Sequence, residues 1–232
     1  MSRGDGTDVH FHDEHQILYA SRGLLSVTTD KGVWLTPGAR AVWIPAGTPH
    51  QHNAFGALTI HTVGLPDVPN PAGVNSTSVV TINRLARDII MELSEVSNPG
   101  DAAAQRLRWV LLDQLTRSVE FPLRVRRPHD PRLILISEAI EQDPQGVSSL
   151  DDAARLISVS SRTMSRLCQA DLGMTFPQWR TQLRLHRALE LLADGWSVTD
   201  VAVHCGWSTA SSFIDVFRRT LGYTPGRRTT AA

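Results

Sequence analysis

The chain has 232 residues, which is enough for one or two domains with a sizeable apolar core. Lys plus Arg and Asp plus Glu balance at 23 each, so net charge alone selects neither an anionic nor a cationic partner. No apolar run approaches the roughly 18 residues that a membrane helix needs. The N-terminus MSRGDGTD does not fit a signal peptide, and with two cysteines we expect no disulfide framework. We therefore expect a cytoplasmic protein that does not contact a membrane.

Residues 9–63 have the pattern of β-strands. Short runs rich in Val, Ile, Leu, Thr and Trp are separated by Gly, Pro and Asp-Lys-Gly turn signals. The runs are QILYAS, GLLSVTT, GVWLTP, RAVWIPAG and ALTIHTV. Short strands at a spacing of about ten residues predict a small antiparallel barrel or sandwich. A Pro- and Gly-rich stretch closes this first domain, which we place at residues 1–75.

Helical periodicity then replaces the strand pattern. Apolar residues recur at 3.6-residue spacing in 79–96 and in 102–119, and Asp101 is in position to cap the second helix. We expect an antiparallel helix pair within 76–121. One apolar stripe of the pair can cover the barrel, while a second would form a dimer interface; alternatively, both stripes belong to the core. The Arg- and Pro-rich stretch 122–131 is predicted to be an extended linker.

Two segments near the C-terminus, 149–175 and 197–224, repeat one another imperfectly. Each begins with Ser-x-x-Asp, a variant of the capping box, and ends in Leu-Gly after a turn and another helix. Residues of the two segments match at an offset of 48 positions up to Ser160 and Ser208, which are expected to cap the second helix of each segment. After a one-residue insertion, they match at an offset of 49. This pattern predicts two helix-turn-helix units, joined by a long helix over 176–195 that Gly195 closes.

The second helix of each unit is expected to enter the major groove of DNA, where base edges can be distinguished. From Arg155 to the C-terminus there are ten arginines against five acidic residues, which favours an anionic partner. Helical spacing buries Met164, Leu167 and Cys168 in the first helix and Phe213, Val216 and Phe217 in the second. The candidate DNA contacts are therefore Ser161, Arg162, Ser165, Arg166, Gln169, Thr209, Ser211, Asp215, Arg218 and Arg219. The alternative is that these residues form the solvated faces of a small helical bundle.

Arg166 is the leading candidate to read a base, and Arg162 is the second. A bidentate contact from an arginine to guanine is the commonest specific contact in the major groove. Asp215 either accepts from a cytosine amino group or pairs locally with Arg218 or Arg219.

Two sequences stand out in the segment from about 129 to 228, RTMSRLCQADLGMTFPQWR and VAVHCGWSTASSFIDVFRRTLGYTPG. Their motifs make this segment resemble the DNA-binding domain of the AraC/XylS family of bacterial transcription regulators. The resemblance implies a DNA-binding domain over 132–232. Two positions depart from the family pattern: Ser158 stands where a glycine is usual, and Asp215 where a neutral or basic residue is common. At Ser158 we expect a left-handed or altered turn.

The N-terminal half contains two spaced motifs: Gly4, His10, His12, Gln16 and Gly23 form the first, and Gly38, Pro45, Gly47, His50 and Asn53 form the second. With these motifs it is similar to the cupin-type sensor domains found in the same family, except that Gln16 stands in place of the usual Glu. The resemblance implies that His50 lies beside His10 and His12. Three imidazoles would favour Zn, Fe, Ni or Cu, with Gln16 or water completing the shell, although an amide binds cations less well than a carboxylate. His15 has the other strand parity and is predicted to be a solvated turn residue.

Two other roles for these histidines stay open, which are contact with an organic ligand and a purely structural role. We assign Trp34, Trp43, His52 and His61 to an effector pocket. The simpler interpretation of the two tryptophans is core or pocket wall, and the two histidines are more often hydrogen-bonded barrel or rim residues.

Together these features predict an α+β protein, with a small cupin-like β-barrel and a helix pair followed by an all-α tandem helix-turn-helix domain. We expect a transcription regulator that binds promoter DNA, responds to a small molecule or metal ion, and acts as a homodimer. RNA polymerase is a further partner if it is an activator. The alternative is a cupin metalloenzyme, such as a dioxygenase or isomerase. An enzyme has no need of a tandem DNA-binding module, so we expect no catalytic activity.

Overall fold

The computed structural model describes residues 6–37, 40–65, 76–96, 100–116, 120–121 and 124–226, with the backbone alone at 116, 120, 121 and 124. The chain divides into two compact units: one contains most of the residues up to Leu123, and the other begins at Arg124 and also includes Lys31–Val33. Gly4 and Gly38, two positions of the cupin-like motifs, lie outside the described residues. Within the described residues, no helix has both the length and the apolar character needed to cross a membrane.

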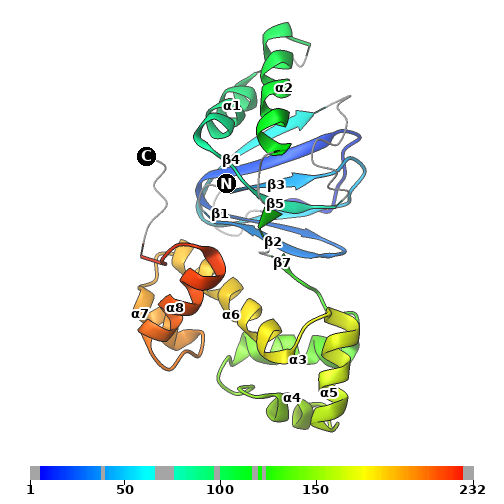
Figure 1. The fold of residues 1–232 in the computed structure, drawn as a ribbon, viewed down its shortest axis with the longest axis vertical. Coiled ribbons are helices and arrows are strands. Elements are labelled where there is room, and N and C mark those ends of the chain that lie inside the picture. The colour runs from blue at the N-terminus through cyan, green and yellow to red at the C-terminus, as the bar shows by residue number, and fades with distance from the viewer. Residues whose placement is uncertain are drawn as a thin grey trace. The chain divides into compact units, whose positions relative to one another are not determined.

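The N-terminal unit is built on a curled antiparallel sheet (Figure 1). Its strands are β1 (His15–Thr29), β2 (Gly32–Thr36), β3 (Arg40–Ile44), β4 (Gln51–Leu65), β5 (Ser78–Thr81) and β6 (Glu120–Phe121). They follow the order β6-β5-β3-β1-β2, and β4 pairs with β1. The predicted α+β class with an N-terminal β domain is confirmed, in the form of a curled half-barrel.

Strand β1 is one long strand, where the sequence pattern predicted two. Gly23 does not turn the chain back. With a φ of 81°, it lies in a bulge where the register against β4 shifts, between Ala20 and Leu24. A Cβ at Gly23 would come within 2.7 Å of the Ala57 carbonyl oxygen, so the two strands approach closely only because a glycine is here. The bulge bends the sheet and lets the strand continue.

Both faces of this sheet are buried, and residues alternate between them along each strand. We call one the inner face; it is formed by Leu18, Ala20, Leu25, Val27, Trp34, Val42, Ile44, Ala54, Leu58 and Val79. We call the other the helix-facing side; it is formed by Ile17, Tyr19, Ala41, Trp43, Val63, Leu65 and Val80, together with the apolar stripes of two helices.

Those helices are α1 (Arg84–Glu95) and α2 (Ala102–Thr116). The predicted start of the first helix at residue 79 is wrong, because 78–81 form β5 and pair with the edge of β3. The helix begins instead after Asn83, whose side chain accepts from the Ala86 amide. The predicted cap at Asp101 is confirmed, since its carboxylate accepts from the Ala103 amide at 3.1 Å.

The C-terminal unit contains a short strand and two helix-turn-helix units, as the repeat predicts (Figure 1). Its elements are β7 (Arg124–Val125), α3 (Pro131–Gln142), α4 (Leu150–Leu156), α5 (Ser161–Leu167), the π-helical turn η1 (Cys168–Leu172), α6 (Phe176–Ala193), α7 (Val198–His204) and α8 (Ala210–Leu221). The expected caps at Ser149, Ser160 and Ser197 are confirmed, because each side chain accepts from a backbone amide of the helix that follows. Helix α6 links the two helix-turn-helix units. Gly195 follows the end of α6 and has a φ of 89°.

The turns of the two helix-turn-helix units adopt the same backbone conformation, although they use different residues. Ser158 has a φ of 55° and Gly206 a φ of 77°, so both turns pass through the left-handed region. The same hydrogen bond follows each: the Val159 amide donates to the Ala154 carbonyl at 2.9 Å, and the Trp207 amide to the Ala202 carbonyl at 2.8 Å. The left-handed turn expected at Ser158 is confirmed, and it places a Cβ in a conformation that favours glycine.

Ser158→Gly should stabilise the protein, because it removes backbone strain at an exposed position whose side chain is not needed for packing. We expect the free energy of unfolding to rise by about 0.5–1 kcal/mol. Thermal or denaturant unfolding of the full chain measures the change. Ser158→Ala, which keeps the Cβ, should have little effect.

The matched change Gly206→Ser should destabilise the protein, since its Cβ would also lie 3.0 Å from the Pro144 carbonyl oxygen. Equal stability of wild type and Ser158→Gly would show that the strain at this turn is negligible.

Candidate functional site

The segment before β1 pairs with the chain at the start of β4. His10 and His50 form an isolated antiparallel bridge, and Gly6 and Asn53 form another. The His10 amide donates to the His50 carbonyl at 2.9 Å, and the His50 amide donates back at 2.8 Å. His10 and His12 therefore lie on an irregular extended segment, not on a regular strand as predicted. The pairing nevertheless brings His10 and His50 side by side.

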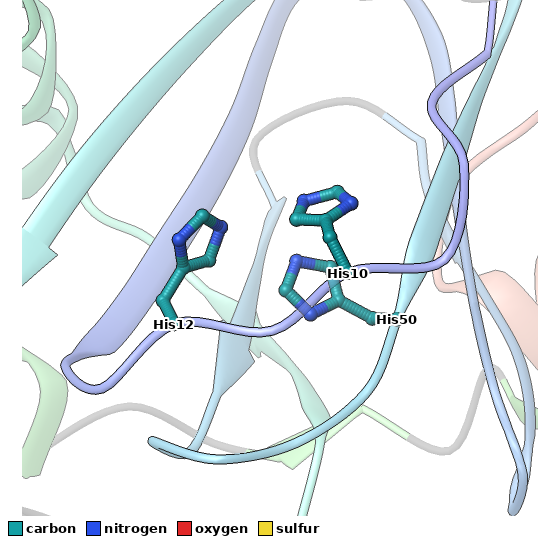
Figure 2. A group of neighbouring side chains, drawn as sticks. All are labelled: His10, His12 and His50. Carbon is teal, nitrogen blue, oxygen red and sulfur yellow. The ribbon is translucent and has the colours of Figure 1, made fainter.

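Three imidazole rings converge at this point (Figure 2). One nitrogen from each of His10, His12 and His50 lies within 4.8 Å of the others. Ring centroids are 4.5 Å apart for His10 and His50, 5.0 Å for His10 and His12, and 5.5 Å for His12 and His50. The His12 carbonyl accepts from the Gly47 amide at 2.8 Å, which holds this segment to the turn before β4. Within the described residues, this is the only group of three such side chains close enough to share an ion.

Hydrogen bonds to the backbone orient two of the rings. Nδ1 of His10 lies 2.7 Å from the Asp8 carbonyl oxygen, and Nδ1 of His50 lies 2.9 Å from that of Thr48. A carbonyl only accepts, so each Nδ1 must be the donor, and in a neutral imidazole that tautomer leaves the lone pair on Nε2. Burial lowers the pKa of His50, although the Thr48 bond opposes this. Its Nε2 atom is buried and has no hydrogen-bond partner among the described residues.

Gln16 and His52 lie on the inner face, as the strand register shows. Gln16 is two residues before Leu18 on β1 and so lies on the same face, and His52 stands opposite Val27. The Gln16 Oε1 atom is buried without a hydrogen-bond partner. The His52 ring centroid lies 6.0 Å from that of His10, and burial followed by the neighbouring histidines lowers the pKa of His52. Two further polar groups thus accompany the three histidines on this side of the sheet.

The four residues assigned to an effector pocket do not lie together, so that prediction is wrong. Trp34 and His52 are on the inner face, whereas Trp43 and His61 are on the helix-facing side. His61 stands opposite Tyr19, and its two ring nitrogens lie 2.9 Å from the hydroxyls of Ser94 on α1 and Ser21 on β1. The assignment failed because the sheet is buried on both faces, and apolar content does not distinguish one face from the other.

His15 is also not the solvated turn residue that was predicted. It is half-buried at the start of β1, and its ring stacks on Trp43 with centroids 4.9 Å apart. Its Nδ1 accepts from the Ala46 amide at 3.1 Å, and burial lowers its pKa. His15 is therefore a structural residue on the helix-facing side.

Helix α5 is the second helix of the first helix-turn-helix unit, and we call it the first recognition helix. Together with its continuation η1, it exposes the residues that the helical spacing predicts. Arg162, Ser165, Arg166 and Gln169 are exposed, and Met164 and Cys168 are fully buried beneath them. Ser161 differs, because it is half-buried and its hydroxyl donates to Asp151. Helix α5 continues into η1, which the sequence did not reveal.

The second recognition helix, α8, buries Phe213 and Phe217 and exposes Ser211, Asp215, Arg218 and Arg219. Within the described residues, Asp215 forms no ion pair with Arg218 or Arg219, so the local pairing considered for it is not present.

The predicted cap at Ser208 is wrong. Thr209 caps α8, with its hydroxyl accepting from the Ser212 amide at 3.1 Å. The one-residue insertion therefore lies in the turn of the second unit, before the cap.

Two arginines that contribute to the basic excess are turned into the domain. Arg180 and Arg184 donate to backbone carbonyls and are half-buried and buried, respectively. Counting charges along the sequence does not separate such arginines from those that face solvent.

Comparison with known proteins agrees with both units. Residues 1–112 match the AraC-like ligand binding domain family, and residues 153–229 match a helix-turn-helix domain family. The chain is 29% identical over 230 residues to NimR, an HTH-type transcriptional regulator of Escherichia coli K12, with 96% of this chain and 84% of that protein covered. It is 36% identical over 179 residues to the HTH-type transcriptional regulator RipA of Corynebacterium diphtheriae, with 75% of this chain and 50% of that protein covered.

Among solved structures, ToxT from Vibrio cholerae aligns with 99% of this chain and 95% of that chain, at 10% identity and a TM-score of 0.43. The two family matches fall on the two units of the structure, and the relatives share one description as transcriptional regulators. The chain belongs to the AraC family of transcription regulators, with an N-terminal ligand-binding unit and a C-terminal helix-turn-helix unit that binds DNA.

Proposed function

We propose that this regulator binds a divalent transition-metal ion through His10, His12 and His50, and that the ion controls its affinity for promoter DNA. The observation that carries the proposal is the buried, unpartnered Nε2 of His50 within a cluster of three convergent rings. A buried polar atom without a partner costs free energy, and a bound ion would remove that cost. Neutral imidazoles suit Zn, Fe, Ni or Cu, whereas Mg and Ca prefer oxygen shells.

The fourth ligand of the proposed metal ion would be Gln16 or a water molecule. The buried and unpartnered Oε1 of Gln16 supports the first choice, because an amide oxygen can serve as a weak ligand. Gln16→Glu would supply the carboxylate that the cupin motif usually has, and it should tighten metal binding if this side chain reaches the ion.

We propose that the ion acts as a signal and not as a catalyst. The relatives are transcription regulators, which supports a sensing role. An ion can signal only if it binds two conformations with different affinity, since equal binding shifts no equilibrium. An organic ligand held by the same histidines is the alternative, and the following experiment separates the two.

Protein purified without chelator or affinity-tag metal should contain about one divalent ion per chain, measured by elemental mass spectrometry. His12→Ala should lose this ion, because it removes one of the three converging nitrogens. His15→Ala is the matched control, since His15 stacks on Trp43 on the helix-facing side and should leave the metal content unchanged.

Equal metal content in wild type and His12→Ala would overturn the metal site and favour an organic ligand. If metal is present, DNA affinity must also differ between the loaded and stripped protein. Equal affinities would leave the ion as a structural component.

We propose that Arg166 reads a base. It is exposed on α5 next to Ser165 and Arg162. Arg166→Ala should relax the preference at one position of the bound sequence, by about 1–3 kcal/mol for a bidentate contact to guanine. Binding to a panel of duplexes with single-base changes measures this. Arg132→Ala, at a partly exposed arginine on α3 that pairs with Asp130, serves as the control. A uniform loss across the panel would mark Arg166 as a phosphate contact.

We propose that α1 and α2 form a homodimer interface. Leu85, Met91, Trp109 and Val110 expose much of their apolar surface on these helices. Leu111 on α2 is not part of this exposed surface, because its side chain is fully buried in the core, and a charge at this position would destabilise the fold.

Val110→Glu should therefore convert the dimer to monomers and weaken DNA binding, because it places a charge among these exposed apolar side chains. Light scattering measures the molar mass. Leu135→Glu, at an exposed apolar position on α3, is the matched control. A folded Val110→Glu protein that remains dimeric would place the interface elsewhere.

A further inference from the structure

Helix α6 carries two arginines one turn apart, Arg180 and Arg184, which face the same side of the helix. Like charges at this spacing ordinarily repel, and burial lowers the pKa of Arg184 to about 10, with Arg180 as the next cause. Both side chains are nevertheless directed into the C-terminal unit, where Arg180 donates to two backbone carbonyl oxygens and Arg184 to one.

Arg180 holds the loop that precedes the first helix-turn-helix unit. Its Nε donates to the Val147 carbonyl at 2.7 Å, and one terminal nitrogen donates to the Pro144 carbonyl, also at 2.7 Å. The planar guanidinium thus spans two carbonyls of the loop between α3 and α4. A lysine could not reproduce this fork.

Arg184 holds the turn of the second unit. Its Nε donates at 2.6 Å to the carbonyl of Cys205, the residue that ends α7. Its guanidinium carbon lies 3.9 Å from the centroid of the Trp207 ring, in a cation–π contact. A cation at the C-terminal end of a helix also interacts favourably with the helix dipole.

The loop held by Arg180 and the turn held by Arg184 contact each other. A Cβ at Gly206 would come within 3.0 Å of the Pro144 carbonyl oxygen, so the backbones are already close. The Gln145 side-chain amide donates to the Val203 carbonyl at 3.4 Å. The two helix-turn-helix units are therefore joined by this contact as well as by α6.

A helix-turn-helix unit does not need a buried arginine to fold. Helix α3, which precedes the first unit as α6 precedes the second, buries Leu133, Ile136 and Ile140. The cost of burying the Arg184 guanidinium is thus specific to α6, the helix that both units share.

We propose that Arg180 and Arg184 are positioning residues that set the separation and angle of the two recognition helices, and so determine which spacing between two DNA half-sites the protein accepts. Neither arginine contacts DNA in this role. Two recognition helices that read one face of DNA must match half-sites about one helical turn apart, roughly 34 Å. A shift of one base pair both translates and rotates the second half-site, so the tolerance for it reports how firmly the two helices are held.

The test uses a duplex selected by the full wild-type chain from a random-sequence pool, with derivatives in which the half-sites are one base pair closer or farther. A further derivative keeps the first half-site alone. Arg180→Lys keeps the charge and loses the fork. We expect its preference for the original spacing over the shifted spacings to fall by about tenfold, with affinity for the single half-site unchanged.

Arg132→Lys, on the partly exposed surface of α3, is the matched control and should keep the wild-type preference. Equal loss on all duplexes, the single half-site included, would overturn the proposal and make Arg180 a phosphate contact or a general support of the fold. An unchanged spacing preference would overturn it as well. Failure to select any duplex would contradict sequence-specific DNA binding itself, and the following measurement then decides the proposal without DNA.

Spin labels at Ser165→Cys on α5 and Ser211→Cys on α8 report the distance between the recognition helices in the full chain. The native Cys168 and Cys205 are buried, and burial raises the pKa of each thiol to about 11, so both should label poorly. Arg180→Lys and Arg184→Met should each broaden the distance distribution relative to the labelled parent. If Arg184→Met fails to fold, Arg180→Lys alone decides. A distribution as narrow as that of the parent would refute the positioning role.

Discussion

The sheet of the N-terminal unit must bury both of its faces, and the arrangement of its histidines follows from this. The side chains of the inner face pack against one another around Trp34, and α1 and α2 cover the other face. Because side chains alternate along a strand, each residue's parity decides which of the two environments it enters. Histidines on the inner face lie near other histidines, whereas those on the helix-facing side contact hydroxyl groups and aromatic rings.

Strand β4 illustrates how the two environments are connected. Near its start, His52 lies on the inner face close to His10, and His50 lies just before the strand. Farther along, His61 turns to the other side and contacts Ser94 on α1. One strand therefore runs from the histidine cluster to a contact with α1, one of the two helices that carry exposed apolar side chains. A change at the cluster that moved β4 would also move its contact with α1.

The C-terminal unit shows how two copies of one motif diverge without loss of the fold. Both turns adopt the left-handed conformation and make the same backbone hydrogen bond, although one uses Ser158 and the other Gly206. Glycine is favoured in the second turn for an additional reason, because a Cβ at Gly206 would lie only 3.0 Å from the Pro144 carbonyl oxygen. Ser158 in the first turn is exposed, and serine is accommodated there at the cost of strain.

Much of this structure could be predicted from the sequence because it depends on local interactions. Side-chain caps, helical periodicity and turn residues act within a few positions of the chain, so the tandem helix-turn-helix units, the caps at Ser149 and Ser160 and the exposed face of α5 could be predicted. The resemblance to the cupin motifs likewise placed His50 with His10 and His12. Contacts between distant segments decided the rest: whether Trp43 and His61 share a face with Trp34, whether residues 78–81 join β3 as a strand, and whether Arg180 and Arg184 turn toward solvent or toward carbonyls. A strand face or an arginine has no preferred partner until another part of the chain reaches it, and the sequence does not state which part that is.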